Sequence, residues 1–170
     1  MELRKPELCD KDKLYDYILE HYNNGEYSIS ASNMLPIMDY NDWINKLEGD
    51  SSGKNLEWGI NETYILVDNN MVIGMLNIRY NASDEIINKY GHIGYGVRPS
   101  MRRRGIATYM LNEALVKCKE NGLSEVVLGC YKDNIGSSKT IKKNDGVFYR
   151  EDYMDGKSTQ YYKIKVKDGD

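Results

Sequence analysis

The sequence predicts one domain, residues 1–170, of mixed α and β class built around a single sheet. Three observations support this prediction. The length of 170 residues suits one domain with a core of its own. Charged residues make up 29% of the chain and hydrophobic residues 41%, which is typical of a soluble globular protein. Segments with strand character alternate with amphipathic helices, and no repeat or linker rich in Pro, Gly and Ser divides the chain.

The first third of the chain predicts a short strand at residues 2–5 and two helices. Asp10 can cap a helix over residues 11–23, where apolar residues recur at helical spacing. A second helix is predicted over residues 40–47. The polar, irregular segment between them, residues 26–38, resembles loops that cover binding sites.

The middle of the chain predicts a β-hairpin and a further strand. Residues 63–67 and 72–80 are rich in strand-forming side chains, and they flank the turn signal Asp68-Asn69-Asn70. Another strand is predicted over residues 92–97. Pro99 stops it, because proline donates no amide proton.

The remainder predicts alternating helices and strands. An apolar stripe runs along a helix predicted from Arg103 to Asn121. Residues 126–128 form an apolar run, which is consistent with a strand buried on both faces and paired in parallel. A short helix is then predicted over residues 135–143, followed by two terminal strands at 147–150 and 160–166.

Composition excludes several classes of protein. The three cysteines are widely spaced and only two histidines accompany them, so neither a disulfide framework nor a metal site is predicted. The net charge of −3 argues against broad binding of nucleic acid. No run of about 18 apolar residues could cross a membrane, and the charged start does not resemble a signal peptide. A cytoplasmic location is expected.

The segment from Val97 to Thr108 is the strongest candidate for a binding site. It ends a strand and opens a helix, where free amides and the helix dipole attract phosphate. Gly105 allows an anion to approach the backbone, and three neighbouring arginines add charge. The alternative is an ordinary turn with a solvated basic run. Neither a P-loop nor a dinucleotide fingerprint fits, because Gly105 is followed by Ile106 and Ala107 and the earlier glycines lie within a strand.

The run Arg102-Arg103-Arg104-Gly105-Ile106-Ala107 has the form [Q/R]-x-x-G-x-[G/A]. With Val97-Arg98-Pro99 before it, this run resembles the GNAT superfamily of acyl-CoA-dependent N-acetyltransferases. The segment Asn134-Ile135-Gly136-Ser137-Ser138 looks like the second conserved block of that family. The resemblance extends over about residues 63–148. It looks closest to a small bacterial branch with Gly-His-Ile-Gly-Tyr before the Val-Arg-Pro element.

The resemblance implies a central, mixed, largely antiparallel twisted sheet with a parallel splayed pair, flanked by about four helices. It implies acetyl-CoA as co-substrate, with the pyrophosphate on the amides at the helix start and the pantetheine arm along the preceding strand. The implied cofactor-binding residues are Tyr95, Gly96, Val97, Arg102, Arg103, Arg104, Gly105, Ile106, Ala107, Thr108, Asn134 and Ser137. A plain helix cap also explains Asn134.

An amine acceptor must lose a proton before it attacks a thioester. His92, near the position where many family members place a catalytic carboxylate, is the first candidate base, although a structural role for it is equally open. Glu62 and Glu85 are weaker candidates. The tyrosine that usually protonates the departing thiolate is replaced by Ile141, so Tyr131 and Tyr149 are the remaining candidate acids.

The sequence thus predicts an N-acetyltransferase that acts on a primary amine of a small molecule or peptide. The missing tyrosine motivates an alternative, a non-catalytic acyl-CoA-binding module or sensor, and another phosphorylated ligand is a third option. Some members that acetylate protein N-termini carry a glutamate at the position of Gly129, so the resemblance gives that activity no support here. The 15 tyrosines could form an aromatic cage for a substrate, with Trp43 and Trp58 on the acceptor side, but packing is the simpler interpretation. Cys130 is interpreted as a core residue. No nucleic-acid or membrane partner is predicted, and a homodimer is compatible with the sequence.

Overall fold

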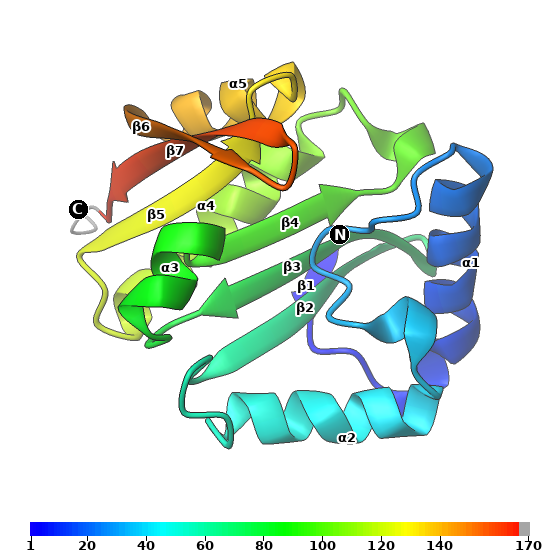
Figure 1. Cartoon of the computed structure of the whole chain (residues 1–170). Helices are drawn as coiled ribbons and strands as arrows, with labels where there is room; N and C mark the ends of the chain where they lie inside the picture. Colours follow the sequence, from blue (N-terminus) through cyan, green and yellow to red (C-terminus); the bar gives the residue numbers. More distant parts are fainter. Residues whose placement is uncertain (167–170) are drawn as a thin grey trace.

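A computed structural model of the chain describes residues 1–166; residues 167–170 of the predicted domain lie outside the described part. Residues 1–166 form five α-helices and two sheets, and Figure 1 shows the helices arranged around the strands. The helices are α1 (Lys11–Asn23), α2 (Tyr40–Ser51), α3 (Asp84–Tyr90), α4 (Ile106–Glu120) and α5 (Ile135–Lys143). The strands are β1 (Glu2–Arg4), β2 (Asn61–Asp68), β3 (Met71–Arg79), β4 (Ile93–Val97), β5 (Glu125–Tyr131), β6 (Val147–Met154) and β7 (Lys157–Lys165). Single 3-10 turns occur at η1 (Leu8–Asp10), η2 (Leu35–Ile37) and η3 (Pro99–Met101).

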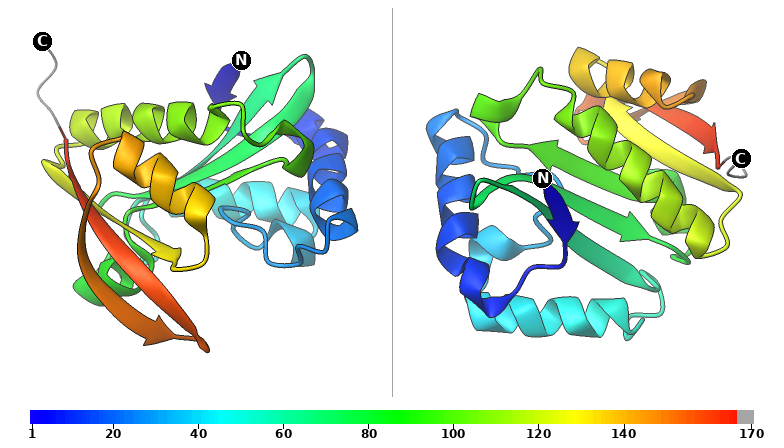
Figure 2. Two further views of the ribbon diagram at one scale, coloured as in Figure 1. Left: turned by 90° about the horizontal axis from the view of Figure 1, so that it is seen from above. Right: turned by 180° about the vertical axis from the view of Figure 1, so that it is seen from behind.

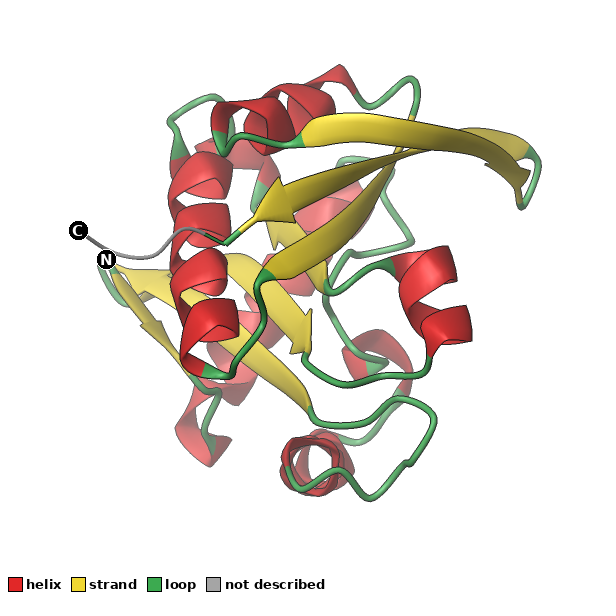
Figure 3. Cartoon of the chain, turned by 90° about the vertical axis from the view of Figure 1, so that its left-hand side faces the viewer, coloured by secondary structure: helices red, strands yellow, loops and turns green. Residues whose placement is uncertain are grey.

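All the strand ladders are antiparallel. The first sheet has the order β1-β2-β3-β4 and the second the order β5-β7-β6. The two sheets meet where the start of β4 approaches β5, and the His92 amide donates to the Val127 carbonyl at 2.8 Å. Figure 3 shows β6 and β7 as a long twisted hairpin that reaches beyond the neighbouring helices. The predicted single sheet is therefore two sheets, which share a core, and the hydrogen bonds between them within residues 1–166 are those of His92 with Val127.

Two apolar cores form on opposite faces of the first sheet. Helix α4 covers one face, where Met110, Leu111 and Ala114 are fully buried. Helices α1 and α2 cover the other face, where Trp43 and Tyr17 are fully buried. The right-hand view of Figure 2 shows α4 lying across the sheet, with α1 and α2 at its margin. The prediction that Trp43 packs in a core is confirmed.

The structure corrects three of the predicted elements. Helix α4 begins at Ile106 and not at Arg103, because Arg103 and Gly105 adopt left-handed backbone angles that a helix cannot contain. Strand β5 pairs with β7 in an antiparallel ladder, although Val126, Val127 and Leu128 are buried as expected. Helix α3 was not predicted. It has seven residues, too few for a clear apolar repeat, although Ser83 caps it through a bond from the Ile86 amide.

The polar segment 26–38 contains η2 and two buried apolar residues, Ile29 and Leu35. It covers part of the core beneath α1 and α2. Within residues 1–166, none of the helices has the length and apolar character needed to span a bilayer.

Candidate active site

The loop that connects β4 to α4 is shaped by two residues with left-handed backbone angles. Arg103 has a φ of 61° and Gly105 a φ of 77°. A residue other than glycine pays roughly 1–2 kcal/mol for this conformation, so the loop holds Arg103 against a local cost. Gly105 is the N-cap of α4 and supplies no capping side chain. A β-carbon at Gly105 would meet no atom within 4 Å, so the start of the helix is open.

The backbone amides of residues 103–108 point to an anion site. None of these six amides has a hydrogen-bond acceptor among residues 1–166. The first bonded donor of the helix is the Tyr109 amide, which donates to the Gly105 carbonyl at 3.0 Å. The positive end of the helix dipole lies behind these amides. The loop therefore presents unsatisfied donors to solvent, in the arrangement that binds phosphate in many proteins.

The arginines of this segment have different roles. Arg102 donates from Nε to the Val97 carbonyl at 3.1 Å, and its two terminal nitrogens bind both carboxylate oxygens of Glu26 at 2.6 and 2.7 Å. The Arg102 guanidinium lowers the pKa of Glu26 to about 2, which keeps the pair ionised. Arg103 and Arg104 are exposed and have no partner in the described part of the chain.

Arg102, one of the three arginines predicted to contact a cofactor, has a role within the protein. Its guanidinium is already occupied by Glu26 and the Val97 carbonyl, so it fixes the loop onto the segment after α1. The charges left for a ligand at this loop are those of Arg103 and Arg104.

Strands β4 and β5 separate beyond His92. The only hydrogen bonds between this edge of the first sheet and β5, within residues 1–166, are those of His92 with Val127. From Ile93 to Val97, β4 pairs with β3 on one side only. Its other backbone edge, including the predicted residues Tyr95, Gly96 and Val97, faces the gap between the strands. This unpaired edge can accept an extended ligand as an additional strand.

Helix α5 lies across this gap and contributes the other predicted residues. The Asn134 carboxamide oxygen accepts from the Ser137 amide at 3.1 Å, so the helix-cap interpretation of Asn134 is confirmed. The Tyr95 hydroxyl donates to the Ser137 hydroxyl at 3.3 Å. Burial raises the pKa of Tyr95 to about 12, so the phenol is protonated at neutral pH. Ile141, at the position of the missing tyrosine, is 1% exposed and belongs to the core.

His92 has a different environment from the one expected of a base. Its Nδ1 accepts a hydrogen bond from the Val127 amide at 2.9 Å. With that lone pair engaged, the neutral ring carries its proton on Nε2 and has no free nitrogen to receive another. Burial, together with the charge of Arg79, lowers the pKa of His92 and favours this neutral form. The structure therefore favours a structural role for His92, which joins the start of β4 to β5 by hydrogen bonds, over a role as a direct base.

The other titratable candidates also have defined surroundings. Glu62 accepts from Lys5, Tyr64 and Tyr80; although burial alone would raise its pKa, these hydrogen bonds lower it. Glu85 is exposed on α3.

The two candidate acids lie at the surface of the second sheet. Tyr131 is 41% exposed beneath the Lys157 ammonium, and Tyr149 is 37% exposed at a bulge of β6, where its hydroxyl accepts from Arg150. Cys130 is buried, and burial raises the pKa of its thiol, in agreement with a core role.

The side of β4 opposite α4 carries two glycines, one of them next to Arg79, a residue to which the sequence analysis gave no role. Gly94 lies directly opposite Asn77 in the β3–β4 ladder, and Gly96 lies opposite Met75. Arg79, at the end of β3, places a terminal nitrogen 3.7 Å from where a β-carbon of Gly94 would be. No sequence signal marks this group, because nothing in the local pattern tells a buried arginine from an exposed one.

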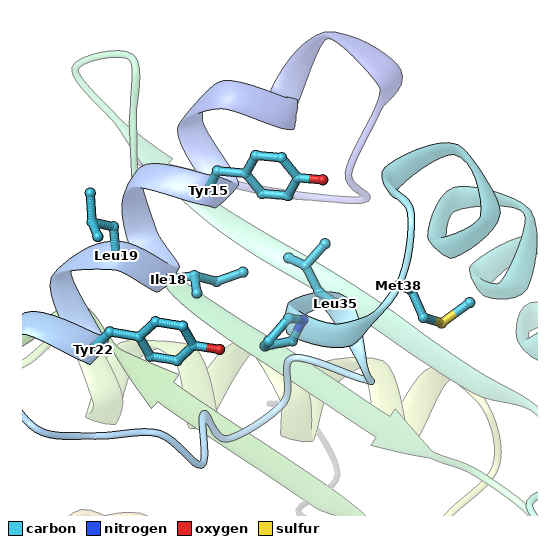
Figure 4. Close-up of a pocket in the computed structure, with 7 residues that line it drawn as sticks. Tyr15, Ile18, Leu19, Tyr22, Leu35 and Met38 are labelled. Carbon is cyan, nitrogen blue, oxygen red and sulfur yellow. The ribbon is translucent and has the colours of Figure 1, made fainter.

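An apolar groove of about 370 Å³ lies elsewhere, between α1 and η2 (Figure 4). Its lining includes Tyr15, Leu19 and Leu35, and no residue of the β4–α4 loop. The groove offers no acid, base or nucleophile beyond two tyrosine hydroxyls, so it does not add to the candidate active site.

Comparisons with known proteins agree with this geometry. Residues 30–145 match the family model described as the acetyltransferase (GNAT) family. No curated protein is significantly similar to the chain in sequence. Among solved structures, the chain is similar to RimL, the ribosomal L7/L12 alpha-N-protein acetyltransferase, in complex with coenzyme A; the TM-score is 0.69 and the identity 19%, with 96% of this chain and 92% of the other covered.

Two further structures have similar folds. One is yncA, a putative acetyltransferase from Salmonella typhimurium with acetyl-CoA, at a TM-score of 0.68 and 11% identity over 99% of this chain and 95% of the other. The other is an N-acetyltransferase from Staphylococcus aureus Mu50, at a TM-score of 0.66 and 19% identity over 98% of each chain. At these identities the likeness establishes the fold.

Proposed function

This chain belongs to the GNAT family of acetyltransferases, and we propose that it transfers the acetyl group of acetyl-CoA to a primary amine of a small molecule or a peptide. The observation that carries the proposal is the run of six unbonded amides at the start of α4. These amides open beside the unpaired edge of β4, so one ligand can contact both features.

The cofactor would be held mostly by backbone. Its pyrophosphate accepts from the amides of residues 103–108, and Arg103 and Arg104 add charge-assisted hydrogen bonds. The pantetheine arm lies along the edge of β4 from Tyr95 to Val97, near Asn134 and Ser137 of α5. Arg102 contributes indirectly, because its bonds to Glu26 and Val97 fix the loop.

The chemistry requires few side chains once the thioester is positioned. The amine nitrogen attacks the carbonyl carbon, the C–N bond forms, and the C–S bond breaks to release a thiolate. We assign protonation of that thiolate to Tyr95, whose hydroxyl reaches the first turn of α5 and is protonated at neutral pH. The Nδ1 lone pair of His92 is taken by the Val127 amide, and the Glu62 carboxylate already accepts three hydrogen bonds. We therefore assign the proton of the acceptor ammonium group to water.

One observation favours the alternative of an acyl-CoA sensor. Ile141 occupies the position of the usual tyrosine and is buried, so the family's common acid is absent. A sensor would bind acetyl-CoA and release no thiol.

The test combines calorimetric titration of acetyl-CoA with a free-thiol assay over a panel of primary amines. We expect saturable binding with one site per chain and amine-dependent release of coenzyme A. Binding without thiol release on any amine would replace the transferase with the sensor. Absence of binding would overturn both functions.

A further inference from the structure

Arg79 is a half-buried arginine that has no acidic partner among residues 1–166. Its Nη1 donates to the Gly91 carbonyl at 3.1 Å, and its buried Nε has no hydrogen-bond partner in the part of the chain that the structure describes. No carboxylate oxygen within residues 1–166 lies within 4.0 Å of the guanidinium. Its side chain thus carries a positive charge that the fold does not neutralise.

Three other arginines are paired with carboxylates. Arg4 pairs with Asp10, Arg98 with Asp16 and Glu20, and Arg102 with Glu26. A buried charge that lacks a partner is costly. Burial lowers the pKa of Arg79 to about 10, so the guanidinium remains charged at neutral pH despite that cost. An unpaired, charged guanidinium is suited to bind a ligand that supplies the missing negative charge.

The space beside Arg79 is open, and a glycine, aromatic rings and amide side chains border it. A β-carbon on Gly94 would have only one neighbour within 4 Å, the Nη2 atom of Arg79 at 3.7 Å. The indole of Trp58 lies 5.7 Å from the guanidinium carbon and stacks on Tyr90 at 5.4 Å between ring centroids. Asn77, opposite Gly94, donates to Asn61 and Thr63. The open space over Gly94 is thus bordered on one side by the Arg79 guanidinium and the aromatic rings of Trp58 and Tyr90.

We propose that Arg79 binds the carboxylate of the acceptor, so that the substrate class is a small amine carrying a carboxylate, such as an amino acid. This inference rests on the proposed function. Gly94 directly precedes Tyr95, at the start of the β4 edge assigned to the pantetheine arm. An acceptor over Gly94 would direct its amine toward the thioester and its carboxylate toward Arg79. A guanidinium offers a carboxylate two parallel hydrogen bonds, which orient it as well as bind it.

The kinetic test uses acceptor pairs that differ only in the carboxylate, namely L-alanine against isopropylamine and 4-aminobutyrate against butylamine. In the wild-type protein we expect kcat/KM to favour one of the carboxylates at least tenfold over its matched amine. Arg79→Gln should reduce this ratio at least tenfold. The control Lys11→Gln removes an exposed charge on α1 and should leave the ratio unchanged. Equal ratios in wild type and Arg79→Gln, or no preference in wild type, would overturn the inference.

A binding measurement separates this inference from the proposed function. The dissociation constants of N-acetyl-L-alanine and N-isopropylacetamide are measured by calorimetry on protein saturated with coenzyme A. We expect the carboxylate to bind at least tenfold more tightly, and Arg79→Gln to abolish the difference. If Arg79→Gln abolishes the difference but no amine is acetylated, the transferase proposal fails and the carboxylate site stands. If amines are acetylated but Arg79→Gln changes neither the kinetic ratios nor the difference in binding, the carboxylate site is wrong and the transferase proposal stands.

A second variant guards against a folding defect in Arg79→Gln. Gly94→Ala adds a methyl group with one ordinary contact at 3.7 Å and no unusual backbone angle, so it should unfold at the wild-type temperature. The methyl group occupies the space assigned to the acceptor. We expect N-acetyl-L-alanine to bind at least fivefold more weakly, and wild-type affinity in a folded Gly94→Ala protein would contradict the site.

Discussion

Two arginines at opposite ends of the β3–β4 pair, the buried Arg98 and the half-buried Arg79, have contrasting surroundings. Arg98, after β4, donates to Asp16, to Glu20 and to the Val72 carbonyl, and is 3% exposed. Arg79, at the end of β3, donates one hydrogen bond to a carbonyl and has no carboxylate partner in the described part of the chain. The charge near the cofactor loop is neutralised inside the protein, whereas the charge at the other end of the strand pair has no carboxylate beside it among residues 1–166.

This contrast shows how the two halves of the site attract their ligands. Near the loop, Arg98 and Arg102 hold α1 and the following segment in place, and the attraction for an anion comes from backbone amides with Arg103 and Arg104. On the acceptor side, the attraction comes from one guanidinium. A charged residue beside a binding site therefore indicates a ligand only when no partner within the protein already neutralises its charge.

The largest expected effect is on stability, at Arg98. Arg98→Gln leaves Asp16 and Glu20 without their cation and removes a donor from a buried carbonyl, so we expect the free energy of unfolding to fall by roughly 3 kcal/mol. Arg79→Gln should cost less than about 1 kcal/mol, because it breaks no ion pair. Urea unfolding of both variants measures the difference, and equal losses would remove the contrast between the two arginines.

The next effect concerns cofactor affinity at Gly105. Gly105→Val places side-chain atoms in the open space before the amides, and we expect the dissociation constant for coenzyme A to rise at least tenfold, about 1.4 kcal/mol. Gly122→Val is a matched control, since Gly122 is also left-handed with no atom near its would-be β-carbon and lies at the far end of α4. Calorimetric titration of both variants compares them. A similar loss of affinity in Gly122→Val would assign the effect to strain in the helix.

A further prediction concerns the role of Tyr95. Tyr95→Phe removes the hydroxyl that would protonate the thiolate, and we expect kcat to fall about tenfold while the dissociation constant for acetyl-CoA changes less than twofold. Stopped-flow thiol release and calorimetry measure the two quantities. A greater loss of kcat in Tyr131→Phe or Tyr149→Phe would return the acid role to one of those residues.

The smallest effect is expected at His92. His92→Leu leaves the Val127 amide without its acceptor and should cost about 1 kcal/mol, whereas His92→Asn keeps an acceptor near Nδ1 and should restore most of it. Asparagine cannot act as a base, so His92→Asn should keep the acidic limb of the pH–rate profile. Loss of that limb with normal folding would support the base role instead.

The same residue predicts a dependence of stability on pH. Because the folded-state pKa of His92 is lowered, its neutral form stabilises the fold above about pH 6.5, and that contribution is lost as the pH falls below this value. His21, whose pKa burial also lowers, titrates in the same direction. Unfolding measured from pH 8 to pH 5 should therefore show a smaller decrease in His92→Asn than in wild type.

Much of the fold was predictable from periodicity and turn signals. The hairpin of β2 and β3, helix α1 and helix α5 lie within a few residues of the predicted ranges. The start of α4 was placed three residues too early, because an arginine with a left-handed angle has no sequence signature. The separation of β4 from β5 follows from long-range pairing, which local patterns do not encode.

The site was predictable only where it depends on backbone. Gly105 and the open amides follow from a strand-to-helix turn with glycine at its end. Which arginine pairs within the protein and which are left for a ligand was not predictable, since Glu26 lies 76 residues before Arg102. Arg79 was missed for the same reason, because the absence of a partner is a property of the folded chain.

The central claim is that the amides of residues 103–108 bind the diphosphate of coenzyme A. A ¹⁵N-resolved NMR titration of the labelled protein with coenzyme A tests it most directly. We predict that the largest amide shifts fall within residues 103–108, with smaller shifts along β4 from Tyr95 to Val97. Saturable binding that leaves the amides of 103–108 unmoved, with its largest shifts elsewhere, would contradict the claim.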